Sequence, residues 1–234
     1  MRPEGISPRR HPEQGGYACG EATRARIVAA AIQVFGEQGY DQASTRKIAA
    51  SAGVNPPALQ YYFHSKEGLH LACAQYIADR VWENLAPALE RGRAALVSGG
   101  RQRAMEALCG VIEALAEGLV ATGSESWSRF IARGKADGAG PAISIIRERI
   151  STPLLEVTTQ LVGAVRGTVA DAEETRLRAC TVLGQVSSLY ANRENTLAVM
   201  GWSQFDAHAL ALIKRVIREH TRGALLTAKS IVSA

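Results

Sequence analysis

Two consecutive tyrosines, Tyr61 and Tyr62, stand shortly before a lysine, Lys66. The apolar residues Leu59 and Phe63 are four apart, so on a helix they face the core together and leave the tyrosines largely outward. Tyrosine offers a flat ring and a hydroxyl donor, and lysine offers a point charge. This combination suits a surface that contacts phosphates and bases, although partial packing of Tyr61 against the next helix is an equally good interpretation.

Short helices must position these side chains. The sequence predicts one helix that begins at Ser44 or Thr45 and a second over 56–63, capped by Asn55. Prolines at the first two positions of the second helix are tolerated, because those N–H groups have no intrahelical partner. A tight Ala-Gly-Val turn joins the two helices, and a helix of two turns is stable only when its neighbours pack against it. The pattern predicts a helix-turn-helix.

Longer helices flank this unit. An apolar stripe of period 3.6 begins after Glu21 and ends at Gly39, and Ser65 caps a helix that we expect to run to about Arg93, bent near Pro87. Residues 1–20 are rich in Pro, Gly and Arg and are expected to be a flexible tail. Contact between this tail and DNA, through Arg2, Arg9 and Arg10, is the less favoured alternative.

The stretch STRKIAASAGVNPPALQYYFHSKEGL resembles the DNA-binding domain of the TetR family of regulators. The upstream segment ARIVAAAIQVFGEQGY is similar to the family's first helix. Together they cover about residues 22–70, and a match of this length is far more specific than a short motif. The residues that carry the resemblance are Thr45, Ile48, Ala49, Ala52, Gly53, Val54, Leu59, Tyr61, Phe63, Ser65, Lys66, Glu67 and Leu69.

The resemblance implies a role for each outward residue. Thr45 would hold a phosphate and Arg46 would reach a base edge, where its fork matches guanine. Gln60 is the best candidate to hydrogen-bond a base, and its amide suits adenine. The implied base-facing residues are Pro56, Pro57, Ala58 and Gln60, and the implied backbone contacts are Tyr61, Tyr62 and Lys66. Pro56, Pro57, Ala58, Gln60 and Gly68 depart from the family's commoner residues, which leaves the base preference open.

The rest of the chain predicts further helices and no strand, so the fold class is all-α. Helices are expected at about 101–121, 125–136, 142–165 with a kink at Pro153, 172–193 with a capping box at Asp171 and Glu174, and 206–228. The segments LHLACAQYIADRV, SRFIARGKADG, ISTPLLEVTTQLVGA and MGWSQFD resemble a branch of the family typified by the regulator CecR. The expected organisation is a tail over 1–20, a DNA-binding domain over 21–67, a ligand-binding and dimerisation body over 68–228 and a tail over 229–234.

The last two long helices carry apolar stripes that suit a four-helix interface between two copies, and ordinary core packing is the alternative. The stripes are Leu177, Val182, Leu183, Val186 and Leu189, then Leu210, Ile213, Val216 and Ile217. The segment around 127–135 contains both aromatic and cationic side chains, which suit a pocket for an anionic or aromatic ligand. The alternative is that these side chains form an internal salt bridge or a solvated face. The pocket candidates are Trp127, Arg129, Phe130, Arg133 and Tyr190.

The composition and the absence of certain motifs exclude membrane-spanning proteins, metal-binding proteins and known classes of enzyme from the expected functions. The 234-residue chain has 47% hydrophobic residues and a net charge of +5, which permits binding to nucleic acid without requiring it. Its four cysteines lack metal-ligand spacing, no apolar run is long enough to span a membrane, and no catalytic motif occurs. We therefore expect a cytoplasmic, ligand-responsive DNA-binding homodimer with double-stranded DNA and a small-molecule effector as partners. The resemblance implies the repressor role, which is the family default. No cofactor, metal or enzyme activity is expected. A helical sensor without specific DNA binding is the alternative.

Overall fold

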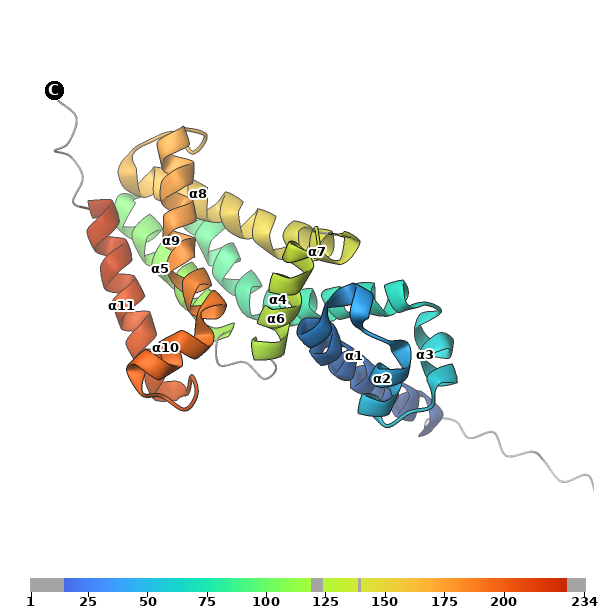
Figure 1. Cartoon of the computed structure of the whole chain (residues 1–234). Helices are drawn as coiled ribbons and strands as arrows, with labels where there is room; N and C mark the ends of the chain where they lie inside the picture. The colour runs from blue at the N-terminus through green and yellow to red at the C-terminus, as the bar shows by residue number, and fades with distance from the viewer. Residues whose placement is uncertain (1–14, 119–123, 139, 227–234) are drawn as a thin grey trace, which may run out of the picture.

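The described residues fold into helices without a strand, which confirms the predicted all-α class. The computed structural model describes residues 15–118, 124–138 and 140–226 (Figure 1). None of the helices in these ranges is long and apolar enough to cross a membrane. The helices are α1 (Gly15–Gln42), α2 (Thr45–Ala52), α3 (Pro56–Phe63), α4 (Lys66–Ser98), α5 (Arg101–Glu117), α6 (Ser124–Ala136), α7 (Pro141–Ile146), α8 (Thr152–Arg166), α9 (Glu173–Ala191), α10 (Arg193–Met200) and α11 (Ala207–Leu226).

Polar side chains cap α2, α3 and α4 as the sequence predicts. Ser44 caps α2, Asn55 caps α3 and Ser65 caps α4, and in each case the side-chain oxygen accepts a hydrogen bond from the N–H three residues later. At Gly39 the backbone of α1 leaves the helical conformation, with φ 78°. Helix α1 begins at Gly15, so it includes part of the segment expected to be a tail, whereas residues 1–14 lie outside the described residues.

Two hydrophobic cores lie along α4. The first, here called the reader core, joins α1, α2 and α3, which we call the reader, to the first half of α4. It also includes Phe130 of α6 and Ile143 and Ile146 of α7, so two helices of the C-terminal body share a core with the reader. Gly36 allows this approach, because a Cβ there would lie 3.2 Å from the backbone nitrogen of Phe130. The body core joins the second half of α4 to α5, α8, α9 and α11.

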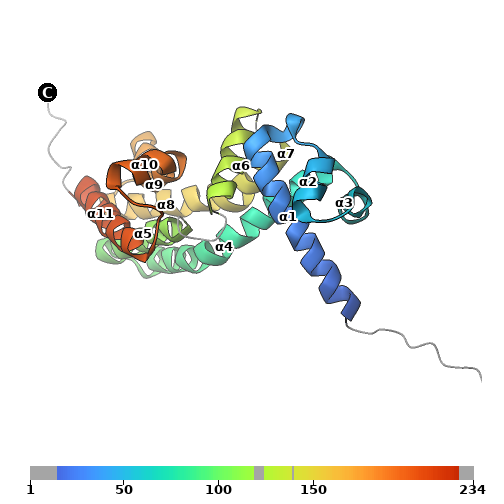
Figure 2. The same ribbon diagram turned by 60° about the horizontal axis from the view of Figure 1, so that its bottom comes forward.

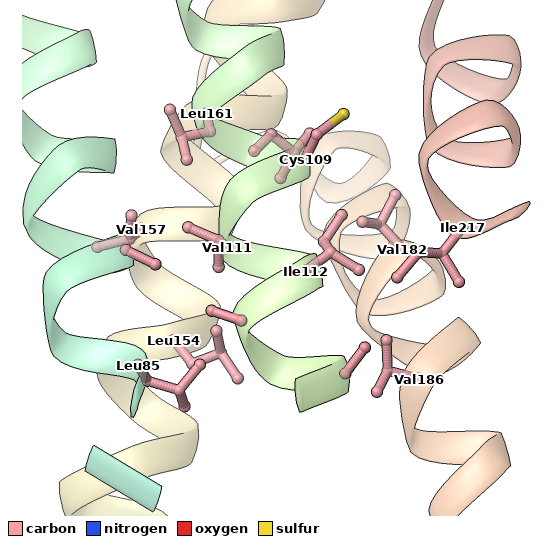
Figure 3. Packing of buried hydrophobic residues seen from close by; sticks show 14 of the residues in the cluster. Leu85, Cys109, Val111, Ile112, Leu154, Val157, Leu161, Val182, Val186 and Ile217 are labelled. Carbon is pink, nitrogen blue, oxygen red and sulfur yellow. The ribbon is translucent and has the colours of Figure 1, made fainter. Parts of the chain in front are cut away.

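The body core is packed mainly from aliphatic side chains of α4, α5, α8, α9 and α11 (Figure 3). Val111 and Ile112 of α5 lie between Val157 of α8 and Val182 of α9 in this view. Among the described residues the buried polar side chains are threonines, Thr158, Thr159, Thr175 and Thr221. Arginines of α11 fix that helix to α5 from outside the core. Hydrogen bonds from Arg222 and Arg218 lower the pKa of the Glu106 carboxyl.

The chain between α7 and α8 differs from the single kinked helix that the sequence predicts. A π-helical turn, Arg147–Ser151, joins the two helices. Pro153 lacks an N–H and its ring would meet the carbonyl four residues earlier, so a wider turn accommodates it.

The capping box predicted at the start of α9 is wrong. Ala172 is the N-cap and forms no side-chain cap hydrogen bond. The carboxylate of Glu174 instead accepts hydrogen bonds from Arg178, one turn further along the same helix. An ion pair between residues four apart therefore competes with the reciprocal cap.

Candidate DNA interface

Helices α2 and α3 form the helix-turn-helix. Gly53 adopts the left-handed conformation, φ 64° and ψ 39°, and its N–H bonds to carbonyls of the last turn of α2. Ile48 and Ala49 of α2 and Leu59 and Phe63 of α3 are buried against α1 and α4. This packing turns the remaining side chains of the two helices toward solvent.

The outward surface contains the side chains that the sequence singled out. Thr45, Arg46, Pro56, Pro57, Gln60 and Tyr61 are exposed, and Ala58, Tyr62 and Lys66 are half-buried. Four of them, Thr45, Pro56, Gln60 and Lys66, line one small hollow together with Leu59, Ser65 and Leu69. Residues from α2, α3 and the start of α4 therefore converge on one surface, although up to 21 positions separate them in the sequence.

The two tyrosines of α3 have different surroundings. Tyr61 is 77% exposed, which argues against its packing on α4. Tyr62 is half-buried and lies edge-to-face against Tyr61, with ring centroids 5.1 Å apart. The pair forms a projecting aromatic surface at the end of α3, with its hydroxyl groups available as donors.

Lys66 is held rather than free at the start of α4. Its Nζ donates to the backbone oxygen of Asp41 at 3.1 Å and lies 4.6 Å from the ring centroid of Tyr40. Burial, followed by the charges of Glu67 and Asp41, raises the pKa of Tyr40. The ammonium group is therefore fixed beside the loop that leads into α2, close to the hollow.

A strained turn connects α3 to α4. His64 has φ 62° and ψ −36°, and the N–H of Ser65 donates to the carbonyl of Phe63 at 2.7 Å, which is a γ-turn of the rare, positive-φ kind. A Cβ at Gly68 would lie 2.3 Å from the same carbonyl oxygen. This contact explains why glycine replaces the acidic residue that the resemblance leads one to expect.

An aromatic cluster connects the reader to the body. His70 of α4 lies 4.7 Å from Phe35 and 4.8 Å from both Tyr40 and Phe130, between ring centroids. Burial, and secondarily the charge of Lys66, lowers the pKa of His70 to about 4, so the imidazole is neutral near pH 7. Phe130, a pocket candidate from the sequence, is buried in this cluster.

The other pocket candidates lie in separate places. Trp127 packs edge-to-face on Tyr76, and Arg133 lies 3.8 Å from Asp137. Arg129 contacts Glu125 on its own helix and reaches Glu194 of α10 at 3.4 Å. Tyr190 donates a hydrogen bond to the carbonyl of Leu115 at 3.2 Å, and burial raises the pKa of its hydroxyl. The structure thus brings four of the DNA-contact candidates, Thr45, Pro56, Gln60 and Lys66, together in one hollow. It divides the pocket candidates between the two cores and the surface of α6.

Comparisons with known proteins agree with this fold. Residues 27–73 match the family described as bacterial regulatory proteins, tetR family. The chain belongs to the TetR family of transcriptional regulators. Residues 104–227 match the C-terminal domain of the HTH-type transcriptional dual regulator CecR. The chain is 33% identical to CecR of Shigella flexneri over 86% of its own length and 90% of that protein, which places it in the CecR branch.

Solved structures share the fold. A TetR-like transcriptional regulator from Rhodococcus sp. RHA1 has a TM-score of 0.61 and 20% identity, over 88% of this chain and 96% of that one. AibR in complex with isovaleryl coenzyme A and operator DNA has a TM-score of 0.59 and 18% identity, over 86% and 97%. At these identities the likeness concerns the fold alone.

Proposed function

We propose that α3 enters the major groove of a palindromic operator and that the bound protein acts as a repressor. The convergence of Thr45, Gln60 and Lys66 on one outward hollow carries this proposal. Thr45, Tyr61, Tyr62 and Lys66 contact the DNA backbone and fix the register. Arg46, Pro56, Pro57, Ala58 and Gln60 face base edges, where the bidentate groups of Arg46 and Gln60 discriminate between bases.

Two copies assemble through α9 and α11. From Ala179 to Asn192 the sequence carries no charged residue, although much of this stretch of α9 is exposed. Leu177 is 63% exposed on the same helix, and Val216 is exposed on α11. Of the other predicted stripe residues, some are buried within the subunit and some are half-buried. The buried ones are Val182, Val186, Ile213 and Ile217, and the half-buried ones are Leu183, Leu189 and Leu210. The exposed, uncharged remainder suits a second copy placed by a two-fold axis, which matches the symmetry of a palindrome.

A small-molecule effector acts through α6 in this proposal. Trp127, Arg129 and Arg133 lie on α6, and their ring and guanidinium groups suit an aromatic or anionic molecule. Phe130 on the same helix packs against the reader, and Tyr190 of α9 belongs to the body core. A ligand that displaces α6 therefore changes the position of the reader and the spacing of about 34–36 Å between the two recognition helices.

The test is binding of the purified protein to DNA that flanks its own gene, with excess unrelated duplex as competitor and over a series of salt concentrations. We expect protection of one palindromic site and a steep fall in log K against log salt. Equal binding to both duplexes would contradict the operator proposal and favour a helical sensor. Because a DNA-bound regulator works where the genome is, the proposed location is the cytoplasm.

The direction of regulation needs its own measurement. The relative with 33% identity is named a dual regulator, so activation of a second promoter is the second candidate function. Transcription from the identified promoters, measured in cells with and without the protein, distinguishes repression from activation. We expect higher transcription of the adjacent gene without the protein, and lower transcription would identify an activator.

A further inference from the structure

The hairpin formed by α4 and α5 ends in a tip that carries a concentrated positive charge. Residues 91–105 include four arginines and no acidic residue. The arginines are Arg91, Arg93, Arg101 and Arg103, and all four side chains are exposed. Figure 1 and Figure 2 both show the start of α5 at the end of the body that lies away from α2 and α3. This charge therefore lies outside the proposed DNA interface.

The four arginines lack an acidic partner. In the parts of the chain that the structure describes, none of their side chains forms an ion pair, whereas Arg218 and Arg222 on α11 are paired with Glu106. A free guanidinium group presents a planar set of N–H donors that matches a phosphate or a carboxylate bidentately. Four unpaired positive charges in one hairpin end repel one another, so an anionic partner that neutralises them is favoured.

The arginines project around the hairpin instead of forming one flat face. Two residues correspond to a rotation of about 200° on a helix, so Arg91 and Arg93 point to different sides of α4. Arg101 and Arg103 point to different sides of α5 for the same reason. A partner that follows one side of the hairpin, as a DNA duplex would, meets only part of this set.

The end of α4 beyond these arginines is uncharged and carries an exposed valine. Val97 is 90% exposed, whereas the adjacent Leu96 packs on the body core. Gly99 and Gly100 follow with φ of 70° and 99°, and they turn the chain into α5. Four residues of helix rise about 6 Å, so Arg93 lies about 6 Å behind Val97 along the axis. The hairpin thus presents an apolar side chain in front of its α4 arginines.

This order of groups matches the surface of a bilayer that contains anionic lipid. Apolar side chains of interfacial helices reach about 5–10 Å into the boundary between headgroups and acyl chains, a depth that leaves Arg93 among the headgroups. The N-terminus of α5 has no side-chain cap, so its free N–H groups also favour phosphate. The phosphates of nucleic acid would bind the arginines but would give Val97 no apolar contact. Lipid therefore accounts for both features of the tip.

We propose that the tip of the α4–α5 hairpin, residues 91–103, docks on a bilayer surface rich in anionic lipid. Val97 inserts at the boundary with the acyl chains, and the four arginines bind headgroup phosphates. This binding uses no residue of the proposed DNA interface or of the proposed effector site, so it holds or fails independently of those proposals. The reader lies at the other end of the molecule and stays clear of the bilayer.

Co-sedimentation of the full chain with vesicles tests the proposal. The vesicles consist of phosphatidylcholine alone or of phosphatidylcholine mixed equally with phosphatidylglycerol, and the parent protein should prefer the mixture. Each arginine near an anionic surface strengthens binding about fivefold, so R91A/R93A and R101A/R103A should each bind the mixture about 25-fold more weakly. The control R26A/R147A removes two exposed arginines elsewhere and should bind like the parent protein.

A second set of variants tests the insertion of the valine. Val97→Ser should weaken binding to the mixed vesicles by about tenfold, because a buried aliphatic side chain is lost. Val97→Trp should show fluorescence quenching by brominated acyl chains beyond the quenching seen in the parent protein. Thermal unfolding should be unchanged in all these variants, since every substituted side chain is exposed. Parental affinity of Val97→Ser, together with no added quenching in Val97→Trp, would overturn the insertion.

The remaining outcomes concern the class of the partner. Equal binding of the parent protein to both kinds of vesicle, or parental binding by R91A/R93A and R101A/R103A, would overturn the proposal. A lower slope of log K against log salt for these two variants on an unrelated duplex would then assign the arginines to nucleic acid. Loss of vesicle binding in the two variants, with an unchanged slope on the duplex, is the result expected for a lipid-binding tip.

Discussion

Gly68 shows how one residue can be required at the turn between α3 and α4, the helices that contain Gln60 and Lys66, two of the proposed DNA contacts. A Cβ at this position would meet the Phe63 carbonyl, which belongs to backbone and cannot move aside as a flexible side chain would. The same carbonyl closes the γ-turn at His64. The orientation of α3 relative to α4, and hence of Gln60 relative to Lys66, therefore depends on the absence of a side chain at position 68.

Substitution of Gly68 by alanine should destabilise the protein by about 1–3 kcal/mol, the usual cost of overpacking. Urea unfolding measures this, and affinity for the identified DNA site should fall as well. Gly110→Ala is the matched control, because nothing lies within 4 Å of a Cβ there and α5 is helical at that point. The control should be stabilised by about 0.4–1 kcal/mol. Equal effects of the two substitutions would contradict the steric explanation.

Gln60 and Lys66 line the same hollow, but truncation of each side chain should change DNA binding in a different way. If the amide has its proposed role at a base edge, Gln60→Ala should reduce discrimination at one base pair by about 1–3 kcal/mol and leave the salt slope unchanged. If the ammonium group has its proposed role at a phosphate, Lys66→Ala should weaken binding to all sequences and lower the slope by about 0.9 per subunit. Binding to a set of single-base variants of the site, at two salt concentrations, distinguishes the two patterns. A similar profile for both variants would show that the assignment of roles is wrong.

At the scale of elements, the sequence predicts what local signals determine. Ser44, Asn55 and Ser65 each cap a helix through a hydrogen bond to the N–H three residues later. Such a cap is local, so it can be predicted from the sequence without knowledge of the fold. The close approach of α6 to α1 has no such local signal. Gly36 and Phe130 are far apart in the sequence, and neither residue type alone indicates which helix it packs against. The division of the pocket candidates between two cores was unpredictable for the same reason, since membership of a core depends on long-range packing.

The contact between α4 and α6 makes the stability of this junction sensitive to acid. Because the pKa of His70 is lowered from 6.5 to about 4 in the folded protein, the unfolded chain binds more protons between these values. The stabilisation from neutral His70 is therefore complete above pH 6.5 and is lost as the pH falls toward 4. Because the side chain is only partly buried, we expect a contribution of roughly 1–2 kcal/mol.

Unfolding free energies at pH 7.5 and pH 5 test this expectation. The loss of stability between the two values should be smaller in His70→Gln than in the parent protein. His208→Gln, at an exposed position on α11, should lose as much as the parent. If His70→Gln loses as much as the parent protein does, the imidazole is not held neutral by the junction.

At the scale of the whole molecule, an interface between two copies through α9 and α11 would have a consequence for DNA binding. Two weak contacts to half-sites become one strong contact when a stable interface joins the subunits, because the second contact is then intramolecular. Leu177, 63% exposed on α9, and Val216, exposed on α11, offer apolar area that a carboxylate would disrupt. Val97 at the end of α4 is 90% exposed and lies on neither helix, so it provides a matched control.

Leu177→Asp, and independently Val216→Asp, should shift the protein toward monomers in sedimentation equilibrium, with Val97→Asp unchanged. Affinity for the full palindrome should then fall by about 100-fold, while affinity for an isolated half-site stays the same, since the reader is untouched. A fall in both affinities would indicate damage to the reader instead of loss of the partner. Retention of the dimer by both variants would place the interface elsewhere on the body, and the half-site spacing in the operator would then have to be explained by a different pair of helices.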